Sequence, residues 1–401
     1  MRVLLVHNRY RTSAPSGEDA AVRNEQRMLE RQGVEVVCFD RCNDDIDDST
    51  LLSKASAAAD TIWSRRARAE LSKVLRSVRP NVAHVHNTFS MLSPSIYGAC
   101  QAEGVPVVQT LHNFRLFCPG ALFLRDGKPC EDCVDKTLLE SVRHRCYRGS
   151  FAATATLASM LTLHRALGTY SRHIDRYIAL TEFARNKVIK AGVPARSVVV
   201  KPNFVPDPPS AGDGSGDYVV FVGRLFEGKG AATLLDAWRQ LPEVKLKIVG
   251  DGGLRAALQS MAQLEQLNVE FLGAQNRAVV LDLIAKAKIL IIPSEWYEGF
   301  PMVIAEAFAC GTPVLASKIG SLEELVAEGI RGRQFAAGNS LQLAAGVRRI
   351  LGDGAALRRM RINARTFFEQ HLTEQGNYAS LMSIYSAVID NAPRHERRRQ
   401  I

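Results

Sequence analysis

Two glutamates lie eight positions apart in SEWYEGFPMVIAEAFACGTPVLAS, residues 294–317, around a Gly-Phe-Pro turn. The apolar run 289–292 predicts a strand and Pro301 suits the first position of a helix, which puts Glu298 in the connecting loop and Glu306 on the helix. The exposed amides and positive dipole at a helix start attract phosphate. Because carboxylates beside that site would oppose phosphate, we expect them to hydrogen-bond sugar hydroxyls, one on a transferring sugar and one on a ribose.

The cations that a diphosphate would need lie upstream, in FVGRLFEGKG. Arg224 and Lys229 follow a predicted strand and precede a predicted helix. Arginine can hold a diphosphate through paired hydrogen bonds, and lysine supplies a movable point charge. Together they would stabilise a leaving diphosphate without a metal. The alternative interpretation is an ordinary solvated pair of cations.

The elements that position these residues repeat along the chain. In residues 216–317, β-branched runs alternate with segments of helical period, which predicts a parallel sheet covered by helices on both faces. The first half has the same rhythm, with strand candidates RVLLVH, VEVVCF, VAHVH, PVVQTLH, YIALT and SVVVKPN. The predicted fold class is therefore α/β, with two doubly wound, Rossmann-like domains. Ligands of such sheets bind beyond the carboxyl ends of the strands, so the predicted active site is the cleft between the domains.

The domain boundaries follow from composition. A chain of 401 residues, 46% apolar and 23% charged, is expected to form two globular cores. We predict an N-terminal domain at 1–201 with a basic, cysteine-containing insertion at about 113–175. A linker rich in Pro, Gly, Asp and Ser follows at 202–217, then a second domain at 218–372. Residues 373–401 are predicted as a C-terminal helix, Glu374 to Asp390, with a basic tail.

Charge and apolar runs narrow the function classes. No run reaches the roughly 18 to 20 apolar residues of a spanning helix, which favours a cytoplasmic protein that can still contact a membrane surface. The net charge is +10, and residues 1–201 hold 29 basic against 20 acidic residues. This excess fits an anionic substrate, an anionic leaflet or nucleic acid. A nucleic-acid partner is not expected because no matching motif appears. A dinucleotide-dependent oxidoreductase is disfavoured because HNRYRTSAPSGED stands where G-x-G-x-x-G would be.

Several ordered blocks resemble a known family. GRL-x3-KG at 223–230, VGDG at 249–252 and PSEWYEGFPMVIAEAFACGTPVLAS at 293–317 resemble the nucleotide-sugar domain of the retaining glycosyltransferases of family 4, which have the GT-B fold. SGEDAAVRNE, HVHNTFSMLSPSIYGA, QTLHNFRLFCPGALFLRDGKPCEDC, YIALTEF and VKPNFVPD resemble a bacterial capsule and exopolysaccharide subgroup of that family. The resemblance spans nearly the whole chain.

The resemblance implies roles for individual residues. Arg224 and Lys229 would hold the diphosphate, Glu298 would contact the donor sugar, and His112 would lie across the cleft near its reacting face. The implied donor-binding residues are Gly17, Gly223, Gly250, Asp251, Leu272, Gly273, Phe300, Pro301, Met302 and Glu306, with Glu306 on the ribose. Many relatives have Gly-Gly where this chain has Ser16-Gly17, so only Gly17 is carried over. We interpret His84 and His86 mainly as packing or cleft-lining residues.

The same resemblance implies a reaction. A sugar would move from a nucleotide diphosphate sugar to a hydroxyl of a glycan or polyprenyl-diphosphate-linked acceptor, with retention of configuration, in cell-surface polysaccharide synthesis. The leaving phosphate would take the proton of the acceptor, and neither a catalytic metal nor a cofactor would be needed. A phosphorylase or epimerase with the GT-B fold is the alternative.

The insertion carries two features that the reaction does not explain. Cys118, Cys130, Cys133 and Cys146 form C-x11-C-x2-C-x12-C, in which C-x2-C has the spacing of a zinc pair. A structural zinc site, disulfides and unpaired thiols all remain open. The segment 143–176 combines arginines with FAATATLASMLTL, which fits an anionic membrane interface or an apolar core helix with basic ends.

Overall fold

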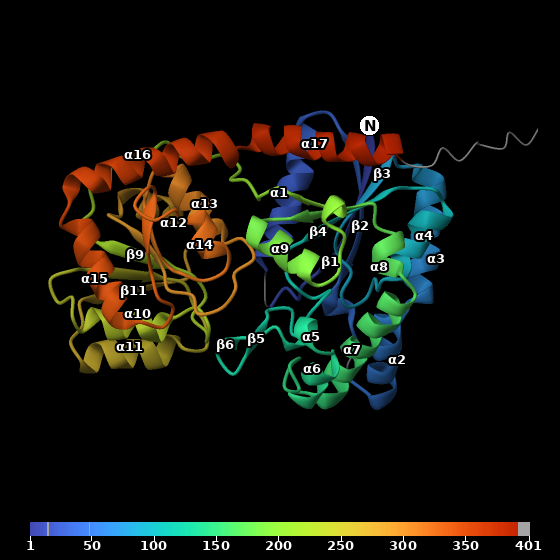
Figure 1. Cartoon of the computed structure of the whole chain (residues 1–401), viewed down its shortest axis with the longest axis horizontal. Helices are drawn as coiled ribbons and strands as arrows, with labels where there is room; N and C mark the ends of the chain where they lie inside the picture. The colour runs from blue at the N-terminus through green and yellow to red at the C-terminus, as the bar shows by residue number, and fades with distance from the viewer. Residues whose placement is uncertain (14–15, 48, 392–401) are drawn as a thin grey trace, which may run out of the picture.

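Two six-stranded sheets, each entirely parallel, form the framework of the computed structural model (Figure 1). The structure describes residues 1–13, 16–47 and 49–391; the predicted basic tail lies mostly outside these ranges. The strand orders are β2-β1-β3-β4-β7-β8 and β11-β10-β9-β12-β13-β14. The predicted fold class, two doubly wound α/β domains, is confirmed.

The first sheet organises the N-terminal half. Its strands are β1 Arg2–Arg9, β2 Glu35–Cys42, β3 Val82–Asn87, β4 Val107–Leu111, β7 Arg176–Ala179 and β8 Val198–Val200. Its helices are α1 Gly17–Arg31, α2 Leu51–Ile62, α3 Arg65–Val78, α4 Ser95–Ala102 and α9 Glu182–Lys190. Strands β3 and β4 are buried along their whole length, as expected for strands covered on both faces.

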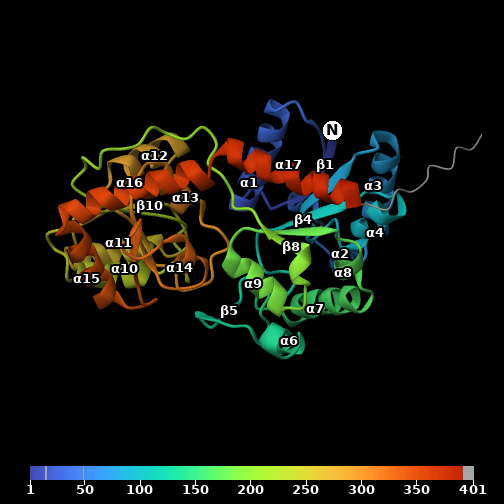
Figure 2. The ribbon, with the colours of Figure 1, turned by 45° about the horizontal axis from the view of Figure 1, so that its top comes forward.

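The insertion leaves this sheet between β4 and β7. It contains the short hairpin β5 Leu124–Arg125 and β6 Lys128–Pro129, followed by α5 Asp132–Asp135, α6 Leu139–Arg143, α7 Phe151–Ala166 and α8 Thr169–Arg172. Figure 2 shows the hairpin extending toward the second domain. Helix α7 buries Leu157 and Leu161 but exposes Phe151 and Leu163, so it is neither a fully buried core helix nor a fully exposed one. None of the helices in the described ranges is both long and apolar enough to cross a membrane.

The second sheet repeats the architecture. Its strands are β9 Val219–Val222, β10 Leu246–Val249, β11 Val269–Gly273, β12 Leu290–Ile292, β13 Val314–Ser317 and β14 Gly332–Phe335. Its helices are α10 Ala231–Trp238, α11 Arg255–Leu264, α12 Arg277–Lys286, α13 Met302–Ala309, α14 Ser321–Leu325, α15 Ser340–Leu351 and α16 Gly354–His371. Strand β14, with the pattern Gly-Arg-Gln-Phe, was not predicted because only its ends are buried.

The last helix, α17 Glu374–Asn391, returns to the first domain (Figures 1 and 2). Its Leu381, Tyr385 and Val388 belong to one buried cluster with Val3 and Leu5 of β1. Helix α16 instead contributes Ala364 and Phe368 to the core of the second domain. The chain therefore crosses between the domains twice, before β9 and between α16 and α17.

Candidate active site

A cavity of about 630 Å³ lies between the two domains. It is formed by the loops that follow β1 and β4 in the first domain and β9 and β12 in the second. Its lining includes nine residues that the sequence singles out: Gly17, His112, Gly223, Arg224, Lys229, Glu298, Phe300, Pro301 and Met302. The carboxyl ends of both sheets therefore contribute to one cavity, as the fold class predicts.

Glu298 and Lys229 form an ion pair in this cavity. Lys229 Nζ lies 2.6 Å from Glu298 Oε1, and the same oxygen accepts hydrogen bonds from Ser294 Oγ at 2.7 Å and Trp296 Nε1 at 2.8 Å. Burial raises the pKa of the Glu298 carboxyl, but the Lys229 ammonium and these hydrogen bonds outweigh it, and the pKa lies below its ordinary value. Among the described residues nothing hydrogen-bonds Oε2, so this oxygen can accept a hydroxyl of a ligand.

Arg224 lies on the loop after β9 and is exposed, with its guanidinium 5.1 Å from the centre of the Phe226 ring. The start of α13 belongs to the same cavity lining. The helix begins at Met302, and Pro301 is its N-cap instead of its first helical residue as predicted. The reason is that Pro301 adopts an extended ψ of 109°. The cavity thus joins an exposed cation to the free amides of a helix start, which together favour an anion.

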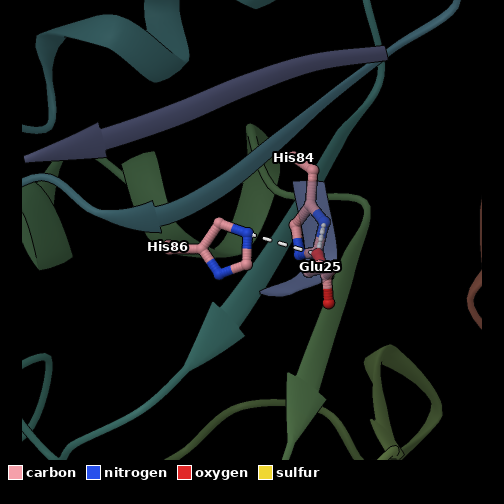
Figure 3. A group of neighbouring side chains, drawn as sticks. All are labelled: Glu25, His84 and His86. Atoms are coloured by element: carbon pink, nitrogen blue, oxygen red, sulfur yellow. Dashed lines mark ion pairs between the residues drawn. The ribbon is translucent and has the colours of Figure 1, made fainter. Parts of the chain in front are cut away.

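His112 follows β4 and connects the cavity to a buried polar network. Its Nε2 lies 3.0 Å from His86 Nδ1, and His86 Nε2 lies 3.3 Å from Glu25 Oε1. His84 Nδ1 is 2.9 Å from the same oxygen, and Figure 3 shows both imidazoles directed at the carboxylate. His84 and His86 are buried, as packing residues are, and both also belong to a hydrogen-bonded polar system behind the cavity.

These contacts determine the tautomer of His112. Burial lowers the pKa of His86 to about 3, with His84 contributing, and burial likewise holds the pKa of His112 well below its ordinary value, so both rings are neutral. We assign the proton of His86 to Nε2, because a bare nitrogen would face the carboxylate of Glu25 lone pair to lone pair, although the two atoms, 3.3 Å apart, do not complete a hydrogen bond of normal geometry. His86 Nδ1 is then an acceptor for the Nε2–H of His112. The Nδ1 of His112 is left without a proton and can accept a hydrogen bond.

A cation is already present beside Glu25. Ligand atoms of Glu25, His84 and His86 lie within 4.8 Å of one another, close enough to suggest a metal site. However, the buried Lys201 ammonium lies 3.2 Å from Glu25 Oε2 and donates a hydrogen bond to Asn377 Oδ1 at 2.9 Å. Burial raises the pKa of Glu25, but Lys201 and His84 outweigh it and the pKa lies well below its ordinary value. Lys201 thus balances the carboxylate without a metal.

Five other predicted residues do not line the cavity: Gly250, Asp251, Leu272, Gly273 and Glu306. Gly250, with φ of +139°, packs so tightly that an added Cβ would lie 1.9 Å from the carbonyl oxygen of Gly223. Its amide donates to Gly273 O at 2.8 Å. Asp251 pairs with Arg255, and Leu272 O accepts from Gln275. Glu306 lies 3.6 Å from Arg277, and burial raises its pKa against the effect of that arginine.

Close contacts across the cleft accompany the cavity. A Cβ at Gly299 would lie 2.8 Å from the carbonyl oxygen of His112, so only glycine allows this approach. The carboxylate of Glu324 accepts hydrogen bonds from the amides of Glu182 and Phe183, at the start of α9 in the other domain. The rings of Phe183 and Tyr297 pack 4.9 Å apart.

The cavity residues that the sequence reasoning missed include the polar side chains of Tyr10, Glu18, Asn113 and Arg115. Glu18 Oε2 accepts hydrogen bonds from Tyr10 at 3.1 Å and Asn113 at 3.2 Å. Burial raises the pKa of Glu18 to about 7. A carboxylate directly after the loop at the carboxyl end of β1 was the available signal, but Glu18 also suits the first turn of α1 for purely structural reasons.

Comparison with known proteins identifies the family. The sequence model of Glycosyltransferase Family 4 matches residues 17–207, and that of Glycosyl transferases group 1 matches residues 208–367. The two matches meet in the chain and together cover both domains. The chain belongs to the family 4 glycosyltransferases with the GT-B fold, as the sequence resemblance indicated.

Individual relatives extend this result. An uncharacterized glycosyltransferase of Methanocaldococcus jannaschii is 30% identical over 39% of this chain and 44% of its own length. An uncharacterized 42.6 kDa protein in the cps region of Klebsiella pneumoniae is 23% identical over 75% of each chain. The chain spans about two fifths of the length of the first curated relatives that it matches. The crystal structure of Anabaena HepE in complex with UDP aligns with a TM-score of 0.67 and 19% identity, over 96% of this chain and 100% of that one.

Proposed function

We propose that this protein transfers a sugar from a nucleotide diphosphate sugar to a hydroxyl of a glycan or lipid-linked oligosaccharide. The observation that carries the proposal is one interdomain cavity that joins Arg224, Lys229 and the start of α13 to Glu298 and His112. Cations and free amides suit a diphosphate, and a carboxylate and a neutral imidazole suit hydroxyls. HepE, with the same fold, has been crystallised with UDP and with UDP-glucose, which supports a nucleotide-sugar donor.

The leaving diphosphate would be stabilised by electrostatics. Arg224 is exposed to the cavity and can bind phosphate directly, while Lys229 is held in place by Glu298 and can share its ammonium with a phosphate oxygen. The backbone amides of Phe300 and Met302, on either side of Pro301, add positive potential where the departing charge develops. The dipole of α13 acts in the same direction.

The sugar and nucleoside would bind on either side of the phosphates. Glu298 Oε2 and His112 Nδ1 are acceptors for sugar hydroxyls. Glu306, one turn along α13, is the proposed ribose ligand, and the tight turns at Gly250 and Gly273 shape the surface proposed for the base. The close packing of the Gly250 backbone against Gly223 supports this proposal, because a surface made of backbone atoms is one against which a flat base can lie.

We propose retention of configuration and no catalytic metal. Glu298 is a poor nucleophile for a covalent intermediate, because Lys229 and the hydrogen bonds of Ser294 and Trp296 lower the pKa, and so the basicity, of its carboxylate. Arg224, Lys229 and the helix start supply the positive charge that a metal would otherwise supply. The leaving phosphate then receives the proton of the acceptor hydroxyl on the same face of the sugar.

The acceptor would enter from the first domain, where Glu18, Tyr10 and Arg115 line the same cavity. The relative in the Klebsiella cps region supports a role in cell-surface polysaccharide synthesis. We place the protein in the cytoplasm with a peripheral contact at the inner face of the membrane. This placement is supported by the basic first half and by the exposed Phe151 and Leu163 of α7.

A thermal-shift panel of nucleoside diphosphates and their sugars tests the donor site. One diphosphate should raise the melting temperature of the protein by several degrees, and Lys229→Ala should abolish the shift. Lys286→Ala, which removes an exposed lysine on α12, is the matched control and should keep it. The absence of a shift with every diphosphate, in a protein that melts cooperatively, would contradict the proposal.

Product analysis tests the reaction. Incubation of the selected donor with lipid-diphosphate oligosaccharides should yield a new glycoside whose anomeric configuration, read by NMR, matches that of the donor. An inverted product would refute retention. A sugar phosphate or a new sugar nucleotide would instead identify the phosphorylase or epimerase alternative.

A further inference from the structure

The second domain completes a helix of the first domain. Helix α14 lies next to α9 (Figures 1 and 2), and the carboxylate of Glu324 accepts hydrogen bonds from the amides of Glu182 at 3.0 Å and Phe183 at 2.8 Å. The first amides of a helix have no partner within the helix itself. The next amide, that of Ala184, is bonded inside the first domain, to Thr181 Oγ1 at 3.1 Å. The start of α9 is therefore fully capped only while the two domains are together.

The β12–α13 loop (293–301) reaches the same place through Tyr297. Its hydroxyl donates a hydrogen bond to Glu131 Oε1 at 3.2 Å. Glu131 belongs to the insertion of the first domain, and its carboxylate also accepts hydrogen bonds from Lys187 Nζ at 2.5 Å and Lys190 Nζ at 3.0 Å, both on α9. One carboxylate thus joins the insertion, α9 and the β12–α13 loop of the second domain.

The β5–β6 hairpin adds an apolar contact to the same domain. Leu124 lies 3.8 Å from the position that a Cβ of Gly228 would occupy, and Gly228 directly precedes Lys229. The same position lies 3.7 Å from the ring of Trp296. The insertion therefore contacts the second domain at two points, Glu131 and Leu124, and both are next to residues of the proposed donor site.

These contacts fix the position of Glu298. Tyr297 directly precedes it in the β12–α13 loop. On the other side, Ser321 Oγ, at the start of α14, donates a hydrogen bond to the backbone oxygen of Glu298 at 2.7 Å. A Cβ at Gly320 would lie 2.9 Å from the Tyr297 ring, so α14 and the loop pack without free space between them. Any movement of α14 or Tyr297 relative to the first domain therefore carries Glu298 with it.

The charges at this contact are largely shielded from water. The side chain of Glu131 is only 14% exposed and that of Lys187 19%. Burial raises the pKa of the Glu131 carboxyl, but the ammonium groups of Lys187 and Lys190 outweigh it and the pKa lies below its ordinary value. The carboxylate is thus ionised, and hydrogen bonds to ionised groups are stronger than those between neutral ones. The contact is strong enough to bias how closely the two domains approach.

We propose that Glu131 and Tyr297 are positioning residues of the donor site, which hold the cleft closed before a donor binds. The cavity takes residues from both domains, with His112 in the first and Lys229 and Glu298 in the second. These groups can act on one ligand only while the domains are together. The expected effect on turnover rests on the proposed sugar transfer, whereas the closed cleft itself does not depend on it.

The closed fraction of the protein then sets its apparent affinity for a donor. A ligand that needs groups of both domains binds fully only to closed molecules, and its apparent dissociation constant rises as the closed fraction falls. Saturating donor restores the closed state, so turnover at saturation changes little. A weaker contact at Glu131 therefore raises KM for the donor and spares kcat, whereas a defect in folding lowers kcat and the melting temperature.

Amide hydrogen exchange of the unliganded protein, read by mass spectrometry at residue resolution, tests the closed cleft. Tyr297→Phe removes only the hydroxyl of the contact and should speed exchange of the Glu182 and Phe183 amides about tenfold, because a hydrogen bond to an ionised group is lost. The Ala184 amide, bonded within the first domain, should keep its rate. Tyr218→Phe removes a hydroxyl bonded inside the second domain and is the matched control, which should change neither. Equal exchange in Tyr297→Phe and the unmutated protein, or equal acceleration at Ala184, would overturn the proposal.

Donor kinetics test the effect on the site. Glu131→Lys places a third ammonium group beside Lys187 and Lys190 and should raise KM for the nucleotide sugar at least about tenfold, with kcat within about twofold of the unmutated protein. Glu140→Lys makes the same charge change at a partly exposed glutamate of the insertion and should leave both constants unchanged. Tyr297→Phe should shift KM in the same direction and serves if Glu131→Lys does not fold.

The two measurements separate this proposal from the proposed function. A lower kcat at unchanged KM in the folded variants, or an equal effect of Glu140→Lys, would refute the positioning role. If no nucleotide sugar binds the unmutated protein, the proposed function fails, and the exchange rates of Glu182 and Phe183 still decide whether the contact holds the cleft closed.

Discussion

Glu25→Gln tests whether the buried network controls His112 from a distance. Glu25 touches neither the cavity nor any proposed ligand, yet its carboxylate requires the Nε2 proton of His86 and so sets the tautomer of His112. Glutamine has nearly the same shape but presents a neutral amide. Its NH₂ group can donate to His86 Nε2, which would reverse both rings and turn His112 Nδ1 from an acceptor into a donor.

The substitution also has a cost in stability. Lys201 is buried, and in Glu25→Gln its ammonium loses the carboxylate that balances its charge and keeps neutral partners, Asn377 and the glutamine oxygen. Removing one member of a buried ion pair typically costs about 3–5 kcal/mol of unfolding free energy. The double variant Glu25→Gln/Lys201→Met removes both charges and should recover most of that loss. The stability effect and the tautomer effect can thus be separated.

The expected loss of activity follows from one hydrogen bond. If His112 Nδ1 accepts a hydrogen bond from a sugar hydroxyl, a reversed tautomer loses that bond, and the hydroxyl must rotate to accept from Nδ1–H and find another acceptor for its own proton. An unmade buried hydrogen bond is worth about 1–3 kcal/mol, and 1.36 kcal/mol corresponds to a factor of about ten in rate. The double variant should therefore have kcat/KM about ten times lower than the unmutated protein, although its melting temperature is close to normal.

The assay is a double-mutant cycle in donor turnover. The paired change at Glu25 and Lys201 is measured in the unmutated protein and in a His112→Ala background, with the melting temperature recorded for each. Because Glu25 acts through His112, the effect should shrink to less than about twofold once the imidazole is absent. An equal loss in both backgrounds, or normal turnover in the stable double variant, would refute the reasoning.

Three further outcomes are expected. Glu18→Gln should remove a pH dependence of the free energy of unfolding. The folded protein retains the Glu18 proton up to a pKa of about 7, so the unmutated protein should lose roughly 3 kcal/mol of stability, relative to the variant, as the pH rises from about 4.5 to 7. Urea-melt stabilities of the two proteins that run parallel over this pH range would contradict this. Gly299→Ala should lower kcat with little change in melting temperature, because its Cβ would force His112 and the second domain apart; unchanged kcat would refute a tight contact. Arg224→Ala should lower turnover by on the order of 10²–10³, whereas Arg239→Ala, on an exposed ion pair, should not.

The fold could be predicted from the sequence because most of its strands have a recognisable local residue pattern. Buried parallel strands such as β9 and β12 are short and apolar, with β-branched residues, and each is followed by a helix. The donor loops were accessible for a related reason: Arg224, Lys229 and Glu298 lie in compact blocks whose order along the chain matches the order of the strands. Local pattern and global architecture agree at these positions.

The remaining features depend on tertiary proximity that no local pattern encodes. From the sequence, Glu25 looks like an ordinary polar residue of α1. Only the structure shows that its side of α1 is buried, because α17 returns to the first domain and places Tyr385 OH 2.7 Å from His84 Nδ1. His86 alternates with apolar residues on a strand, which favoured an interpretation as a packing or cleft-lining residue. The same limit applies to the insertion, where Gly120 lies beside both Cys118 and Cys146, which are 28 positions apart in the sequence.

The two chain crossings define how the domains can move. Val205, in the first crossing, donates its amide to Leu372 O in the second at 3.2 Å, so both crossings meet at one place. Helix α17 beyond it is bound to the first domain, since Asn377 hydrogen-bonds Lys201 and Tyr385 hydrogen-bonds His84. Rotation about the crossings would therefore leave the network of Glu25 and His112 intact and change the contacts across the cleft, at Gly299, at the hairpin and between α9 and Glu324. The tautomer of His112 is set within one domain, whereas its distance from the donor is set by the other.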